Sequence, residues 1–112
     1  MDFTFTEEQQ MMAAAARELL DELCESSVLR DIVAGKQYDP AARWARITEL
    51  GLPGVLAPEA AGGMGLGDVD FVLIAEEAGR AVLPEPLVEH AGVAVPLLAE
   101  LAPAAPRAAD WL

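Results

Sequence analysis

Cysteine and aromatic residues are scarce in this sequence of 112 residues, and both shortages limit what the chain can be. Cys24 is the single cysteine, so the chain can form neither an internal disulfide nor a cluster of thiolate metal ligands. Phenylalanine, tryptophan and tyrosine make up only 5% of the residues, and small aliphatic residues dominate the apolar ones. This composition favours close helix packing over a strand-rich sandwich. The sequence therefore predicts an all-α fold, a small bundle of about five helices.

Positive charge is also scarce, since 7 Lys and Arg stand against 19 Asp and Glu, a formal net charge of −12. Nucleic acids and anionic membranes bind clustered basic residues, and here no two bases are adjacent, which argues against both partners. No uncharged stretch approaches the roughly 18 residues of a membrane span. The N-terminus lacks the basic, apolar and small-residue succession of a secretory signal. We therefore expect no membrane span and a cytoplasmic location.

Glycine is concentrated in one loop, GGMGLG at residues 62–67. A loop that binds a nucleotide offers free N–H groups at a helix N-terminus, and a P-loop adds a lysine. No lysine follows here, and Asp68 and Asp70 stand where the anion would lie. We interpret Asp68 as the N-cap of the next helix and the loop as a structural or substrate-facing turn.

Apolar residues recur at helical spacing in five segments that glycine and proline separate. The expected helices begin after Thr6 and, further along, cover about 27–33, 40–50, 68–82 and 87–102. Thr6 and Gln9 have the spacing of a capping box, and Gly51 stands where a helix stops in the left-handed conformation. Ser26 could cap the second segment and Asp39 the third. Pro96 should kink or divide the last helix, because proline removes a backbone donor.

Other positions carry more local predictions. Residues 55–57 are expected to form a short extended run, and Val82 to be buried with the apolar face of its helix. Gly79 lies inside the same helix at a cost on the order of 1 kcal/mol relative to alanine, which predicts close packing there. Since the chain ends on two large apolar residues, we expect a helical domain at 1–106 and, at 107–112, the truncated start of a further helix.

Three blocks cover almost the whole chain: FTFTEEQQMMAAAARELL, WARITELGLPGVLAPEAAGGMGLGDVDFVLIAEEAGRA and PLVEHAGVAVPLL. Together they resemble the N-terminal helical domain of the acyl-CoA dehydrogenase family. The resemblance implies a longer protein in which a β-sheet domain and a four-helix domain hold FAD. It also implies removal of two hydrogens from the α and β carbons of an acyl thioester, with the catalytic glutamate outside these residues. No catalytic, cofactor-binding or metal-binding residue is therefore assigned within this sequence.

The resemblance further implies that the helix after the Gly-Arg segment helps to wall the pocket for the acyl tail, near the glycine-rich loop. The residues that this places at the pocket are Leu87, His90, Ala91, Ala94, Gly62 and Gly63. His90 has two interpretations, a polar group at the pocket floor or a surface or capping histidine. Four carboxylates nearby are interpreted as exposed helix-face residues without a catalytic role. They are Glu76, Glu77, Glu85 and Glu89.

Three functions remain open at this point. The first is the N-terminal part of an FAD-dependent acyl-CoA dehydrogenase of fatty acid or steroid metabolism, contributing acyl-pocket wall and subunit contacts. Its partners would be an acyl-CoA, an electron-transfer flavoprotein or similar acceptor, and further copies or subunits in a homo- or hetero-oligomer. The second is a non-catalytic subunit or helical interaction module of a heteromeric acyl-CoA dehydrogenase. The third is an oxidase or monooxygenase built on the same scaffold.

Overall fold

The computed structural model describes residues 2–36 and 38–111, and within them every regular element is helical. The α-helices are α1 (Glu7–Leu23), α2 (Ser26–Val33), α3 (Pro40–Glu49), α4 (Asp68–Ala81), α5 (Leu87–Glu89) and α6 (Val95–Leu101). A π-helical turn, η3 (His90–Ala94), joins α5 to α6, and the short 3₁₀ segments are η1 (Leu52–Gly54), η2 (Glu59–Ala61) and η4 (Pro106–Trp111). Since α5, η3 and α6 form one continuous run, the prediction of an all-α fold of about five helices is confirmed. The division into 1–106 and 107–112 stays a prediction.

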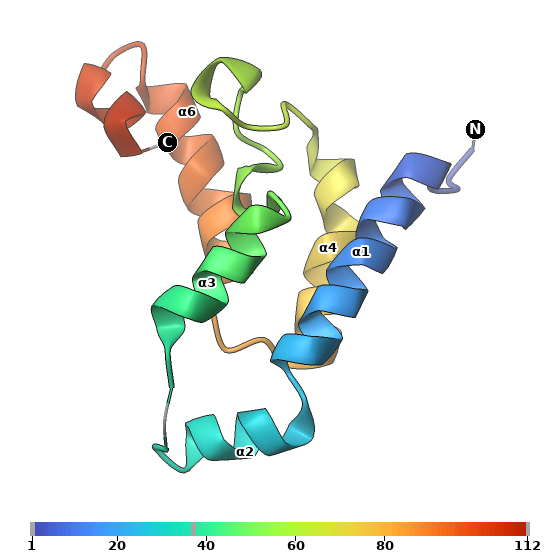
Figure 1. The fold of residues 1–112 in the computed structure, drawn as a ribbon. Helices are drawn as coiled ribbons and strands as arrows, with labels where there is room; N and C mark the ends of the chain where they lie inside the picture. The colour runs from blue at the N-terminus through green and yellow to red at the C-terminus, as the bar shows by residue number, and fades with distance from the viewer. Residues whose placement is uncertain (1, 37, 112) are drawn as a thin grey trace.

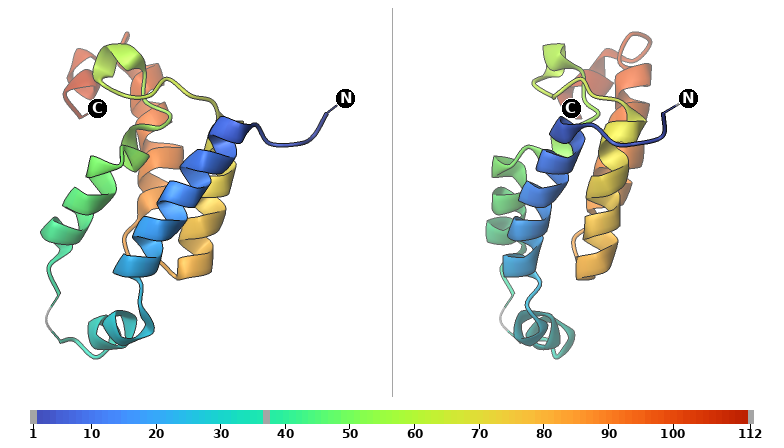
Figure 2. Two further views of the ribbon diagram at one scale, coloured as in Figure 1. Left: turned by 45° about the vertical axis from the view of Figure 1, so that its right-hand side comes forward. Right: turned by 90° about the vertical axis from the view of Figure 1, so that its right-hand side faces the viewer.

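The helices form a thin slab with extents of 44 × 40 × 18 Å. Helices α1 and α4 lie side by side, while α3 and the α5–α6 run lie on the other side of the slab (Figure 1). Helix α2 crosses one end, and the glycine-rich loop and both termini lie toward the opposite end (Figure 2). An α-helix with its side chains is about 10–12 Å across, so a slab this thin cannot cover every helix on all sides. Large apolar side chains therefore remain on its faces.

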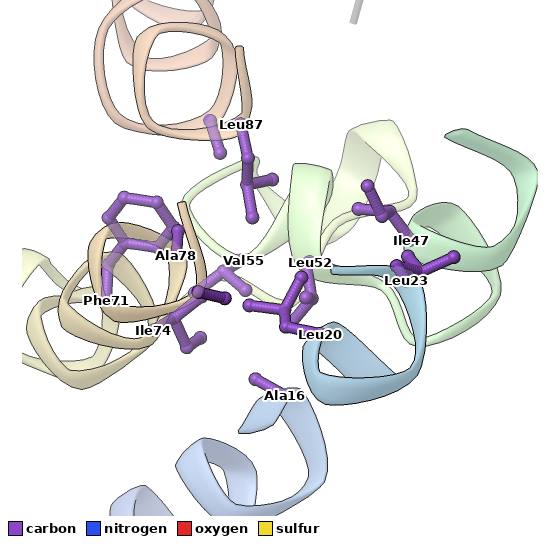
Figure 3. Packing of buried hydrophobic residues seen from close by; sticks show 12 residues of the cluster. Ala16, Leu20, Leu23, Ile47, Leu52, Val55, Phe71, Ile74, Ala78 and Leu87 are labelled. Carbon is purple, nitrogen blue, oxygen red and sulfur yellow. The ribbon is translucent and has the colours of Figure 1, made fainter. Parts of the chain in front are cut away.

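The core lies where these elements meet. Leu20 of α1 packs with Ile74 of α4 and with Leu52 of η1, and none of the three has accessible surface (Figure 3). Leu87 at the start of α5 is equally buried. Burying a side chain of this size contributes about 1.5–3 kcal/mol. This small cluster therefore holds α1, α4, η1 and α5 together.

The predicted helix caps are confirmed at three places. The Gln9 backbone N–H donates to Thr6 Oγ1 at 3.1 Å, and the Thr6 N–H donates to Gln9 Oε1 at 2.9 Å. Asp39 caps α3 by accepting the Ala42 N–H at 3.0 Å. Gly51 ends that helix with φ +80°. These interactions join residues at most three apart, so the sequence is sufficient to specify them.

Two predicted caps are wrong. Asp68 is already the first residue of α4, and Gly67 is the N-cap, whose N–H donates to the Asp70 carboxylate at 2.9 Å. Asp70 can do so because it stands at the third helical position, where a side chain reaches back to the cap. Ser26 is likewise the first residue of α2, and its N-cap Glu25 makes no side-chain hydrogen bond.

The expected extended run at residues 55–57 is also wrong. Val55 has helical angles, φ −55° and ψ −44°, and the residues after it form turns. The glycine-rich loop folds back on this segment, and the Leu66 N–H donates to the Val55 carbonyl at 3.1 Å. A contact between segments about ten residues apart thus decides the local conformation.

Helix α4 ends differently from the sequence prediction. Gly79 is exposed, and a Cβ built on it would have no neighbour within 4 Å, so the predicted close packing is wrong. Val82 is 70% exposed rather than buried, because it leaves the helix in the left-handed conformation with φ 57°. Glu85, expected to be exposed, is only 7% exposed.

At Pro96 the expected division takes the form of a change in hydrogen-bond pattern within the continuous helical run from Leu87 to Leu101, and the run is not interrupted. In η3 the Val95 N–H donates to the His90 carbonyl, five residues back, and Pro96 follows as the second residue of α6. A π-turn of this kind accommodates a missing backbone donor without breaking the helix.

Candidate functional site

Three of the six predicted pocket residues lie at one cavity of about 290 Å³, here called the glycine-loop cavity. Gly62 and Gly63 line it from the loop and His90 from η3. The remaining lining residues are Thr48, Gly51, Pro53, Gly54, Ala57, Met64 and Val95. The structure therefore brings the glycine-rich loop and the histidine together at one cavity.

The glycines of this loop serve the backbone of the chain itself. A Cβ on Gly63 would lie 2.3 Å from both the Cβ and the carbonyl oxygen of Ala57, so only glycine fits. The loop also satisfies its own N–H groups with backbone carbonyls of residues 54–59. The donor and acceptor pairs are Gly62 to Glu59, Gly63 to Pro58, Met64 to Gly54, Gly65 to Ala57 and Leu66 to Val55. No N–H in this run is left for a phosphate, which supports the interpretation as a structural turn.

The other predicted residues lie elsewhere. Leu87 and Ala91 are fully buried in the core and present no surface to a ligand of this domain. Ala94 is half-buried and lies outside the glycine-loop cavity. His90 is half-buried, and its ring packs edge-on against Trp44, with centroids 5.3 Å apart and planes at 80°. His90 also lines a second cavity of about 370 Å³ with Tyr38, Trp44 and the proline-rich turn before α5.

A largely apolar groove of about 280 Å³ lies between α4 and the run formed by α5 and η3, and it is here called the α4–α5 groove. Its lining residues are Leu56, Asp68, Phe71, Val72, Ala75, Val88, Gly92 and Val93. Asp68 is the one charged residue among them. A Cβ on Gly92 would stand 3.2 Å from the Phe71 ring, so glycine here also allows the two helices to approach closely.

The residues expected at the pocket from the sequence, Leu87 and Ala91, each precede by one position a residue that lines this groove. Leu87, Ala91 and Val95 recur every four residues and form the buried stripe of the run. Their neighbours Val88 and Gly92 lie on the adjacent face, which lines the groove. The four-residue spacing was a usable signal, because the most regular apolar stripe of a helix normally faces the core.

Exposed apolar side chains lie in the groove and further along the same helical run. Val72 and Val88 are 49% and 39% exposed, and Val93 is 63% exposed. Leu97 and Leu101 follow Val93 at intervals of four residues, and both are largely exposed. Apolar side chains that gather on a surface mark a ligand groove or an interface more often than single exposed ones do.

The charged groups near these cavities are mainly structural. Arg43 of α3 is paired with the buried carboxylate of Glu85. Burial raises the pKa of the Cys24 thiol, and the hydrogen bond and charge of Arg43 offset this only in part. Among residues 2–36 and 38–111, no group of three or more His, Cys, Asp or Glu could hold a metal ion. The glycine-loop cavity and the α4–α5 groove offer mainly apolar surface, and His90 and Asp68 are the titratable side chains that line them.

No helix in the described part of the chain combines the length and the apolar character needed to cross a membrane. The longest, α1, has 17 residues and carries several charged side chains.

The described residues thus form a thin helical slab with an open, largely apolar groove on it. The sequence matches the family model of the acyl-CoA dehydrogenase N-terminal domain over residues 6–109, so the chain belongs to the acyl-CoA dehydrogenase family. The family and the all-α fold expected from the sequence are thereby confirmed.

Two relatives show how much of a longer protein the chain corresponds to. It is 30% identical over 80 residues to acryloyl-CoA reductase (NADH) of Anaerotignum propionicum, covering 71% of this chain and 20% of that protein. It is 27% identical over 99 residues to acyl-CoA dehydrogenase FadE27 of Mycobacterium tuberculosis, covering 88% of this chain and 26% of that protein. The chain thus spans about a fifth to a quarter of these relatives. No solved structure matches it significantly.

Proposed function

We propose that these residues form the N-terminal part of an FAD-dependent enzyme that dehydrogenates an acyl-CoA thioester between its α and β carbons. In this proposal they contribute one wall of the acyl pocket and contacts between subunits. Membership of the family supports the general activity. The single observation that supports the role of these residues is the α4–α5 groove, whose lining is apolar except for Asp68.

The groove has the chemistry that an acyl tail needs. Each methylene buried there contributes about 0.8 kcal/mol, so a chain of several carbons gains useful affinity from an apolar wall without specific hydrogen bonds. The groove is open to solvent in this domain, and the proposal therefore places the opposite wall on polypeptide beyond these residues. Val88 and Gly92 replace Leu87 and Ala91 as the proposed wall, because the latter two are buried in the core.

The described residues do not fit FAD. The loop that most resembles a phosphate cradle uses its N–H groups from Gly62 to Leu66 on its own backbone. The groove carries a carboxylate, which would repel a pyrophosphate. We therefore place both the flavin and the catalytic glutamate outside this domain and assign no step of the chemistry to it. An acyl-CoA, an electron-transfer flavoprotein or similar acceptor, a cytoplasmic location and a homo- or hetero-oligomer complete the proposal.

A second candidate is a non-catalytic subunit of a heteromeric acyl-CoA dehydrogenase. The exposed stripe of Val93, Leu97 and Leu101 favours it, because such a stripe fits the surface of another helix as well as it fits a ligand. An oxidase or monooxygenase on the same scaffold is the third. These candidates differ in flavin content and in the fate of the electrons.

The test uses the complete protein that contains these residues. A yellow protein whose flavin band bleaches anaerobically with acyl-CoA supports the dehydrogenase, and rapid peroxide formation supports an oxidase. A colourless oligomer supports the accessory subunit. The role of the groove is tested with Val72→Phe, which should raise KM for long acyl chains by about fourfold for each methylene displaced and leave short chains unaffected. Val69→Phe, on the same helix but outside the groove lining, is the matched control.

A further inference from the structure

A buried ion pair joins three separate parts of the chain. Glu85 is the one buried charged residue in the described part of the chain, and the Arg43 and Glu85 side chains are 11% and 4% exposed. Arg43 Nε donates to Glu85 Oε1, and Arg43 Nη2 donates to Glu85 Oε2 at 3.3 Å. Arg43 Nη1 donates to the Leu23 carbonyl at 2.6 Å. This Arg43–Glu85 clamp thus links α3 to the end of α1 and to the turn between α4 and α5.

The turn that carries Glu85 is unusually constrained. Val82 is the one non-glycine residue with positive φ among those described, and a β-branched residue is rarely found there. Pro84 and Pro86 flank Glu85 and fix φ on both sides of it. Strained residues persist where their surroundings leave no alternative, and they concentrate at functional sites. The clamp supplies such a constraint.

Backbone hydrogen bonds connect the turn that carries Glu85 to the start of α5. The Leu87 N–H donates to the Glu85 carbonyl at 2.8 Å, and the His90 N–H donates to the Pro86 carbonyl at 2.9 Å. Val88 follows at once and Gly92 one turn later, and both line the α4–α5 groove. Neither Arg43 nor Glu85 lines that groove, so any influence on it must act through the helix.

Stability alone is a weak explanation for such a pair. Removing two charges from water is costly, and apolar residues of similar volume are often as stable in their place. A pair of this kind is better explained by a geometry that it specifies. Its bidentate fork and third bond to Leu23 hold the turn in one place relative to two helices.

We propose that Arg43 and Glu85 are positioning residues for the α4–α5 groove, because their clamp fixes the start of α5 and with it the wall that faces α4. The inference rests on the proposed function in one respect, that the groove binds an acyl tail. The geometric part, that the clamp places α5, stands independently of it.

The experiment compares three changes in the complete protein. Glu85→Gln removes the charge, Arg43→Lys keeps the charge but loses the fork, and a double Arg43→Met, Glu85→Met variant fills the volume without polar groups. Glu22→Gln is the control, because it weakens an exposed ion pair that also joins α1 to α3. In that pair Glu22 of α1 contacts Arg46, which lies one turn after Arg43 on α3. Hydrogen exchange at residues 87–95, and kcat and KM for short and long acyl-CoA, are measured in each.

The clamp predicts faster exchange at residues 87–95 in all three variants and unchanged exchange in the control. It also predicts that kcat/KM for long acyl chains falls by about tenfold to a hundredfold, while kcat with the shortest chain is kept. The proposal would be overturned if the double Met variant folds well and has the same exchange at residues 87–95, and the same KM for long acyl-CoA, as the wild type. If the wild-type protein binds no acyl-CoA while the variants still exchange faster than it does at residues 87–95, the proposed function is refuted. The positioning of α5 by the clamp is then left intact.

Discussion

Replacing Gly63 by alanine tests how the glycine-rich loop is built. The added Cβ would lie 2.3 Å from the Ala57 Cβ and 2.6 Å from its carbonyl carbon, well inside ordinary contact distance. Two of the three neighbours are backbone atoms, so no side-chain rotation relieves the clash. The loop must therefore move away from residues 54–57.

The cost of that movement follows from what the loop would lose. Overpacking of this severity costs about 1–3 kcal/mol. A displacement on the order of 1 Å also weakens the hydrogen bonds from Met64 to Gly54 and from Gly65 to Ala57, each worth about 1 kcal/mol. Alanine offsets about 0.4–1 kcal/mol of this loss, because it lowers the conformational entropy of the unfolded chain relative to glycine. The net destabilisation is about 3 kcal/mol.

The assay is urea unfolding of the 112-residue chain followed by far-UV circular dichroism. With a slope of about 1–3 kcal/mol per molar urea, Gly63→Ala should lower the midpoint by at least about 1 M. Gly79→Ala is the matched control and should raise the midpoint, because Gly79 lies in an exposed helix interior with open space around it. A Gly63→Ala midpoint at or above that of the wild type would refute the argument from close approach.

Three further predictions concern the core, the cysteine and the start of α4. Leu20→Ala should lower the free energy of unfolding by about 2–5 kcal/mol, whereas Met11→Ala, at a side chain 71% exposed, should change it by less than about 0.5 kcal/mol, as urea unfolding will measure. Because burial raises the pKa of Cys24, its alkylation near neutral pH should be much slower in the folded chain than in urea, and equal rates would contradict this. Hydrogen bonds from the Gln9 side chain, and then from a backbone N–H, lower the pKa of Asp70 below its ordinary value of 3.8. Its stabilising contribution is therefore present above that pH and lost as the pH falls through the lowered pKa, so Asp70→Asn should be destabilising at pH 7 and neutral in strong acid.

Predictions of helix existence and of caps succeeded where the determining contacts are local. The capping box of Thr6 and Gln9, the Asp39 cap and the stop at Gly51 depend on residues close in sequence. The prediction of the α4 cap was wrong by one residue. Asp68 and Asp70 are both acidic, and only the backbone angles decide that the Asp70 carboxylate accepts the N–H of the cap residue Gly67. Local chemistry thus identified the element and left its boundary uncertain by a residue.

The candidate site required more than local chemistry. The sequence singled out one helix and one loop, and in the structure Gly62, Gly63 and His90 line the same cavity, while their role at an acyl pocket stays a prediction. It could not show which face of the helix points into the core. That rotation depends on packing against α4 and η1, and it places Leu87 inside and Val88 at the groove.

The sequence by itself determined the all-α class, the family and most helix limits, because periodicity, caps and motifs are encoded within short stretches of chain. Only the tertiary structure decided that Glu85 is buried, since its partner Arg43 lies 42 residues away. It also decided that the glycines at 62–65 satisfy their own backbone and that the apolar groove lies between α4 and α5. These features depend on which distant segments share the thin slab, and that arrangement follows from packing the whole chain at once rather than from any one segment.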